Sequence, residues 1–146
     1  METLSPGRLY PDRPIVGVGI LIRKGSEYLL IKRAADPDKD LWSIPGGLVE
    51  IGEKAVEAAV REAKEETGLD IELRDILGVV DKIVKDESGQ VKYHFIIIDY
   101  LAEPIGGKME HHDDALDAKW VRLSDFRDYE LSPTLVELLV RIKLLN

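Results

Sequence analysis

The chain has 146 residues, 45% of them hydrophobic and 33% charged, which suits one soluble domain with its own core rather than a disordered chain. Its net charge of −8 argues against a general nucleic-acid surface, because such surfaces need clustered lysine and arginine. The absence of cysteine excludes disulfides and thiolate metal sites, and no apolar run reaches the roughly 20 residues of a membrane span. We expect a cytoplasmic protein with no membrane partner, since the first residues also lack the apolar centre of a secretory signal.

The first half of the chain predicts a hairpin, a short strand and a helix. After an arm over residues 1–13, the domain is expected to span residues 14–146. Residues 14–23 and 28–33 predict paired strands, residues 34–40 a polar loop, and residues 41–47 a short strand ended by Pro45 and two glycines. A helix is predicted from Lys54 to Thr67, with Gly68 as its stop and a buried apolar stripe at Val56, Ala59, Val60 and Ala63.

The second half predicts two long strands, a loop, a further strand and a last helix. The strands are expected at 70–86, 91–103 and 118–123, with a long polar loop over residues 103–117. The last helix is predicted over residues 132–146, with Ser132 as N-cap and Pro133 in its first turn. Strands and helices without regular alternation indicate an α+β domain with helices packed on a central sheet.

The predicted first helix presents three carboxylates on one side. At about 100° per residue, Glu62, Glu65 and Glu66 fall within one arc of roughly 100°. The plain alternative is a solvated charged face, because like charges at this spacing cost only about 0.2–0.5 kcal/mol per pair in water. What favours a binding role is the glycine pair just before the helix, Gly46 and Gly47. Glycines allow close approach to a ligand, and an oxygen-only donor set favours Mg²⁺ or Mn²⁺ over zinc.

Taken together, the segment has a fixed spacing: Gly47, five residues, Glu53, seven residues, then REAKEETGL over residues 61–69. This spacing resembles the Nudix box, the signature of a superfamily of hydrolases that act on nucleoside diphosphates linked to another group. Every fixed position is present between Gly47 and Leu69, and the only oddity is a small residue, Ala63, at a bulky-aliphatic position. The hairpin before the box and the later segment AKWVRLSDF also look like those of small Nudix enzymes, so the likeness covers about residues 14 to 126.

The resemblance implies an α/β/α sandwich with a mixed central sheet, and it assigns roles to the box residues. Glu62, Glu65 and Glu66 would bind Mg²⁺, or Mn²⁺, with the backbone carbonyl of Gly46. Glu53 and Arg61 would brace the segment as an ion pair. The metal would bind the pyrophosphate and activate a water that attacks one phosphorus.

The resemblance implies that the base that takes the water's proton is a helix carboxylate, Glu65 or Glu66, or an acid of the loop before Trp120. Asp114 is the first choice in that loop and Asp113 the second, since they lie where related enzymes often carry a loop acid. Glu110 and Asp117 belong to the same acidic segment, for which a plain solvated loop is the alternative. His111 and His112 are not assigned to the metal, because loop histidines are usually solvated.

The substrate is less closely determined than the reaction. The segments YPDRPIVGVG, GGLVEIGE, KYHFIIIDYLAE and DDALDAKWVRLSDF resemble short ADP-ribose pyrophosphatases, which implies AMP and ribose 5-phosphate as products and a homodimer. Aromatic candidates to stack on an adenine are Tyr10, Trp42, Tyr93 and Phe95. Two alternatives stay open: a pyrophosphohydrolase of nucleoside triphosphates, oxidised ones included, and a non-catalytic nucleotide-binding domain, although such domains usually lose glutamates that this chain retains.

Overall fold

A computed structural model describes residues 8–110 and 115–145. Its strands β1 to β7 form one sheet with the order β3-β2-β1-β6-β5, in which β4 pairs with β1 and β7 with β2. β1 and β6 run parallel, and the other neighbours are antiparallel. The elements are β1 (Ile15–Lys24), β2 (Glu27–Arg33), β3 (Trp42–Ser43), β4 (Gly46–Leu48), α1 (Ala55–Thr67), β5 (Leu69–Lys85), β6 (Val91–Gly107), β7 (Ala115–Arg122), the 3₁₀ helix η1 (Leu123–Asp128) and α2 (Pro133–Arg141).

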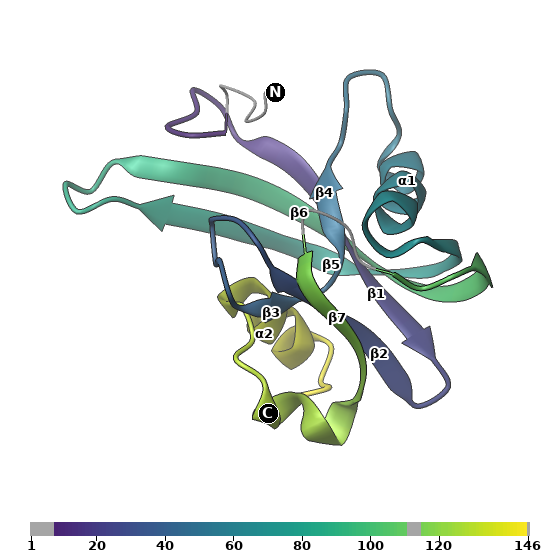
Figure 1. The fold of residues 1–146 in the computed structure, drawn as a ribbon. Coiled ribbons are helices and arrows are strands. Elements are labelled where there is room, and N and C mark those ends of the chain that lie inside the picture. The colour runs from purple at the N-terminus through teal and green to yellow at the C-terminus, as the bar shows by residue number, and fades with distance from the viewer. Residues whose placement is uncertain (1–7, 111–114, 146) are drawn as a thin grey trace.

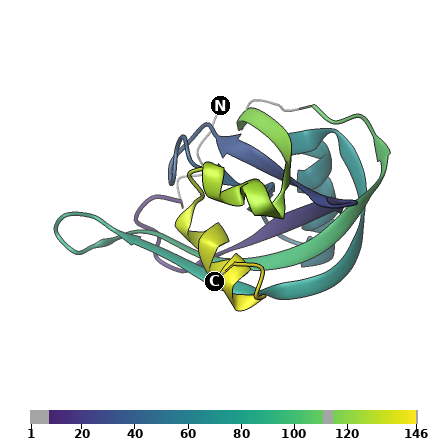
Figure 2. The same ribbon diagram turned by 90° about the horizontal axis from the view of Figure 1, so that it is seen from below.

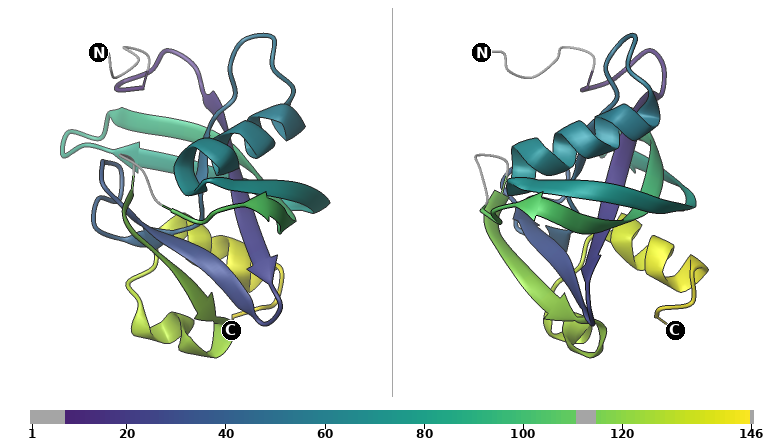
Figure 3. Two further views of the ribbon diagram at one scale, coloured as in Figure 1. Left: turned by 45° about the vertical axis from the view of Figure 1, so that its right-hand side comes forward. Right: turned by 90° about the vertical axis from the view of Figure 1, so that its right-hand side faces the viewer.

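The two helices cover opposite sides of this mixed sheet, so the predicted α/β/α architecture is confirmed (Figures 1 and 3). α2 and η1 lie together on one side, while the β5–β6 hairpin extends past the rest of the domain (Figure 2). Two apolar clusters fill the two sides. The cluster on the α1 side includes Ile20, Ile22, Leu29 and Ala59, and the cluster on the α2 side includes Leu21, Leu30, Phe126 and Leu138. None of the described helices is both long and apolar enough to cross a bilayer.

The predicted end of the first helix at Gly68 and the predicted N-cap of the last helix at Ser132 are both confirmed. Gly68 ends α1 in the left-handed region at φ 80°, and its N–H donates to the carbonyl of Lys64 (2.9 Å). This conformation favours glycine because a side chain at Cβ would be strained there. Ser132 begins α2 by accepting a hydrogen bond from the N–H of Leu135 (3.3 Å).

The predicted buried stripe of α1 was partly wrong. Ala59 and Ala63 are buried as expected, but Val56 and Val60 are 44% and 41% exposed, and Ala58 is buried instead. The buried side is therefore centred on small alanines, which let the helix approach the sheet closely. With this side of α1 against the sheet, Glu66 also lies on the buried side of the helix, where it is only 6% exposed.

Three element boundaries differ from the predictions. Gly46 and Gly47 do not end a strand but form β4, because their backbones pair with β1. The loop expected over 103–117 is shorter, since β6 continues to Gly107 and β7 begins at Ala115. The last helix ends at Arg141, and residues 142–145 follow it without helical structure although their apolar pattern continues.

Candidate active site

The glycine strand β4 places its backbone between β1 and α1. The N–H of Ile20 donates to the carbonyl of Pro45 (2.8 Å), and the next residue along, Gly46, lies opposite Gly19. In an antiparallel pair of strands, hydrogen-bonded and non-hydrogen-bonded residue pairs alternate. Because Pro45 is hydrogen-bonded to β1, its neighbour Gly46 directs both its N–H and its C=O away from β1. The Gly46 carbonyl is therefore turned out of the β1 ladder and toward the helix.

Glu66 lies directly against this backbone. Its Oε1 accepts a hydrogen bond from the N–H of Gly46 (3.4 Å), and its side chain is buried between α1 and the sheet. The following turn is held by Thr67, whose hydroxyl donates to the carbonyl of Ala63 (2.6 Å) and accepts from the N–H of Leu69 (3.2 Å). The end of α1 is thus fixed, and Glu66 has little freedom to move.

Glu62 occupies the space above Gly47. A Cβ placed on Gly47 would come within 2.1 Å of the carboxyl carbon of Glu62 and within 2.4 Å of both of its oxygens. Any side chain at position 47 would therefore displace this carboxylate. The box glycine and the first box glutamate of the helix are thus linked by a direct steric requirement.

Arg61 holds the acidic residues around it in place. Its Nε and Nη2 donate to the two oxygens of Glu53 (2.7 and 3.0 Å), and Nη2 also donates to the carbonyl of Leu48 (3.0 Å). Its Nη1 donates to Glu62 (2.9 Å) and to Glu65 (3.2 Å). The hydrogen bonds to Glu53 raise the pKa of Arg61 and lower that of Glu53, so both groups stay charged. Arg61 therefore offsets the repulsion among these carboxylates.

The donor set fits a hard divalent cation in the type of its oxygen ligands. Glu62 and Glu66 both contact the glycine strand, and carboxylate and carbonyl oxygens are the ligands that Mg²⁺ and Mn²⁺ prefer. The three glutamates are not drawn together as a cage, and across residues 8–110 and 115–145 no group of three Asp, Glu or His side chains lies in metal-binding proximity. Glu65 is 60% exposed and turned to Arg61, so the predicted ligand set would require its side chain to swing inward.

The loop acids are only partly placed by the structure. Asp113, Asp114, His111 and His112 lie outside the described residues. Glu110 lies at the end of α1, where its N–H donates to the carbonyl of Thr67 (2.8 Å). Asp117 lies on β7, and its carboxylate accepts from the N–H of Ala118 (2.8 Å).

The aromatic candidates fall into three different settings. Tyr93 and Phe95 are 9% and 8% exposed and stack on each other with centroids 6.0 Å apart. Trp42 packs edge-on against Tyr129 in the apolar cluster near α2. Tyr10 is half-exposed and is fixed to its own chain, because its hydroxyl donates to Asp86 (2.9 Å).

Two buried charges on the sheet were not singled out from the sequence. Asp99 on β6 is 4% exposed and lies over Gly19, where a Cβ would come within 2.1 Å of its Oδ1. Lys82 on β5 is 8% exposed and forms an ion pair with Asp38 of the loop after β2. Asp99 interrupts the apolar run IIIDY, and Lys82 interrupts the run VVDKIV. An ionisable residue within an apolar strand is the sequence signal that could have revealed both positions.

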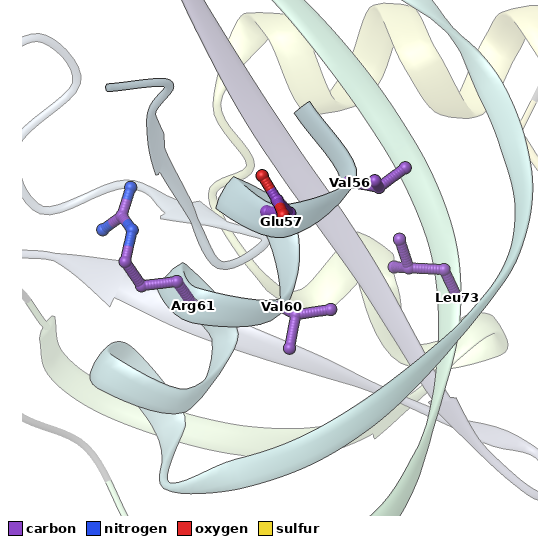
Figure 4. Close-up of a pocket in the computed structure, with 5 residues that line it drawn as sticks. All are labelled: Val56, Glu57, Val60, Arg61 and Leu73. Carbon is purple, nitrogen blue, oxygen red and sulfur yellow. The ribbon is translucent and has the colours of Figure 1, made fainter. Parts of the chain in front are cut away.

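The outer side of α1 carries a separate groove of about 440 Å³. Figure 4 shows Val56 and Val60 pointing toward Leu73 of β5, whereas the guanidinium of Arg61 points the other way. The groove is almost wholly apolar, so it lacks the polar groups that the described chemistry needs.

Comparison with known proteins agrees with this geometry. A family model described as NUDIX domain matches residues 13–141. An ADP-ribose pyrophosphatase of Methanocaldococcus jannaschii is 42% identical over 122 residues, which are 84% of this chain and 69% of the relative. The 8-oxo-dGDP phosphatase NUDT18 of Homo sapiens is 33% identical over 82% of this chain, but the match spans only 35% of that longer protein. A MutT NUDIX hydrolase from Burkholderia pseudomallei superposes with a TM-score of 0.74 at 28% identity, covering 92% of this chain and all of that one.

The chain belongs to the Nudix hydrolase family. The family match covers most of its length, and the box segment from Gly47 to Leu69 runs from strand β4 through a loop into the predicted helix. Among the relatives named above, an ADP-ribose pyrophosphatase is the one with the highest identity.

Proposed function

We propose that the protein hydrolyses the pyrophosphate bond of ADP-ribose to AMP and ribose 5-phosphate, with Mg²⁺ or Mn²⁺ as its cofactor. The observation that carries this proposal is the 42% identity to an ADP-ribose pyrophosphatase over 84% of the chain. The site supports it, because Glu62 and Glu66 sit against the two glycines with Arg61 holding Glu62 and Glu65.

Each residue of the site then has a defined task. Glu62, Glu65, Glu66 and the Gly46 carbonyl would hold the cation, which when bound would neutralise phosphate oxygens and lower the pKa of a water. Arg61 and Glu53 keep the helix and loop in register. The proton of the attacking water goes to a carboxylate. The candidates are Glu65 or Glu66 on the helix and, in the loop, Asp114 as the first choice and Asp113 as the second. Trp42, Tyr10, Tyr93 and Phe95 remain the candidates to contact the adenosine.

A substrate panel tests this proposal. The protein with Mg²⁺ would be incubated with ADP-ribose, other nucleotide sugars, dinucleotides and nucleoside triphosphates, and the products separated by chromatography. Glu66→Gln should lose about 100-fold or more of the activity, because it replaces a buried charged ligand by a neutral amide. Glu87→Gln, an exposed glutamate in the turn before β6, is the matched control and should keep full activity.

A second candidate substrate is an oxidised guanine nucleotide, which the 33% identity to an 8-oxo-dGDP phosphatase favours. Faster turnover of 8-oxo-dGDP or of a nucleoside triphosphate than of ADP-ribose would keep the reaction class and replace the substrate. Nucleotide binding without turnover of any compound in the panel would contradict the enzymatic proposal and leave a binding domain.

A further inference from the structure

A second cleft, of about 680 Å³, opens beside Glu62. One wall comes from the N-terminal arm, and the other comes from the loop that joins β4 to α1. The cleft therefore joins a residue of the candidate metal centre to a segment that lies before the sheet begins. Among the residues that line it are Arg8, Asp12, Arg13, Leu48, Ile51 and Glu62.

Arg8 has an unusual position in this cleft. Its Nε is shielded from solvent, yet it has no hydrogen-bond partner among the described residues. Leaving a buried donor unpaired costs about 1–3 kcal/mol, more for a charged group, so native proteins rarely retain one without a reason. A ligand that enters the cleft and draws this side chain toward it, so that Nε reaches an acceptor, is such a reason.

The two other arginines nearby are already engaged. Arg61 uses its donors on Glu53, Glu62, Glu65 and the Leu48 carbonyl. Arg13 is largely exposed and lies 3.5 Å from the carboxylate of Asp12. Arg8 is thus the guanidinium of this cleft with a solvent-shielded donor that has no partner among the described residues.

The arm that carries Arg8 is fastened to the sheet two residues later. The N–H of Tyr10 donates to the carbonyl of Lys92 at the start of β6 (2.9 Å), and its hydroxyl donates to Asp86 (2.9 Å). Asp86 is itself held by Ser88, and these hydrogen bonds lower its pKa to about 2, so it stays ionised at neutral pH. Tyr10 therefore positions the arm, and the arm presents Arg8 to the cleft.

We infer that Arg8 is a substrate-binding residue that donates a hydrogen bond to a phosphate oxygen of the nucleoside diphosphate. This inference rests on the proposed function, because Glu62, which lines the same cleft, would hold the cation that carries the diphosphate. Together with Arg13, Arg8 supplies positive charge against the repulsion that Asp12 on the arm and Glu50 on the loop would exert on an anion. A guanidinium suits this task, since its planar donors match phosphate oxygens.

Equilibrium binding of a non-hydrolysable diphosphate tests the inference without relying on turnover. Adenosine 5′-(α,β-methylene)diphosphate with Mg²⁺ would be titrated calorimetrically into the wild type, Arg8→Gln, Arg8→Lys and the control Arg127→Gln. Arg127 lies exposed on η1, on another part of the domain. We expect Arg8→Gln to weaken binding about 10-fold or more, Arg8→Lys to recover part of it, and Arg127→Gln to change nothing. The melting temperature of Arg8→Gln without ligand should not fall below that of the wild type, because the variant removes an unpaired buried donor; weaker binding is then not a loss of folding.

The outcomes distinguish this inference from the proposed function. Equal affinity of Arg8→Gln and the wild type would overturn the role of Arg8, even if ADP-ribose is hydrolysed. Absence of probe binding to the wild type would overturn it as well. Weaker binding in Arg8→Gln together with no hydrolysis of ADP-ribose would support Arg8 as a diphosphate ligand and reject ADP-ribose as the substrate.

Discussion

The buried carboxyl of Asp99 predicts a pH dependence of stability whose sign and size follow from the structure. Burial raises the pKa of Asp99 to about 7 from an ordinary value of 3.8, and the positive charge of Arg141 opposes this rise only in part. The folded state therefore retains a proton that the unfolded chain has already lost between these two pH values. Stability must fall as the pH rises from about 4 to 7 and then level off.

The magnitude follows from the shift in pKa. Each unit of pKa corresponds to 1.36 kcal/mol, and a rise of about three units gives a loss of about 4 kcal/mol as an upper value. Asp99→Asn has nearly the same shape and carries no titrating proton, so it should lack this loss. The stability of Asp99→Asn relative to the wild type should therefore increase by up to about 4 kcal/mol between pH 4 and pH 8.

Urea unfolding of both proteins at several pH values between 4 and 8 measures this difference. Asp128→Asn is the control, because Asp128 is exposed at the end of η1 and its removal should give a constant difference. A difference between Asp99→Asn and the wild type that stays constant across the pH range would refute the reasoning. It would mean that the Asp99 carboxyl is ionised in the folded protein at pH values well below 7.

Two further predictions concern the box itself. Gly47→Ala should displace the Glu62 carboxylate and weaken Mg²⁺ binding about 10-fold, because a Cβ at position 47 would lie 2.1 Å from the carboxyl carbon of Glu62. Gly78→Ala is the control, because a Cβ at position 78 meets nothing within 4 Å. Equal Mg²⁺ affinities of Gly47→Ala and the wild type in a calorimetric titration would contradict the steric argument. Arg61→Lys should lower kcat/KM about 10- to 100-fold although the charge is kept, because the single nitrogen of lysine cannot span the acceptors on Glu53, Glu62, Glu65 and Leu48 that the guanidinium reaches. Steady-state kinetics beside Arg127→Lys checks this, and full activity in Arg61→Lys would show that charge alone is required.

Local signals in the sequence were sufficient for most of the elements and for proposing the metal ligands. A helix from about residue 54 to Gly68 follows from its periodicity and from a glycine that can adopt a positive φ. The spacing of Gly47, Glu53 and REAKEETGL was enough to recognise the family, because a pattern of this length specifies residue types without any knowledge of contacts.

Only the tertiary structure decided which side of each element is buried and which distant residues meet. The periodicity of α1 favoured Val56 and Val60 for the core, but close packing on the sheet selects the smaller Ala58, Ala59 and Ala63. The arm residue Arg8 meets Glu62, more than fifty residues later, in one cleft because Tyr10 fastens the arm to β6. Asp99 is buried because Gly19, on a strand eighty residues earlier, leaves room for its carboxyl. Contacts of this kind depend on how strands pair across the whole chain, and no local pattern records them.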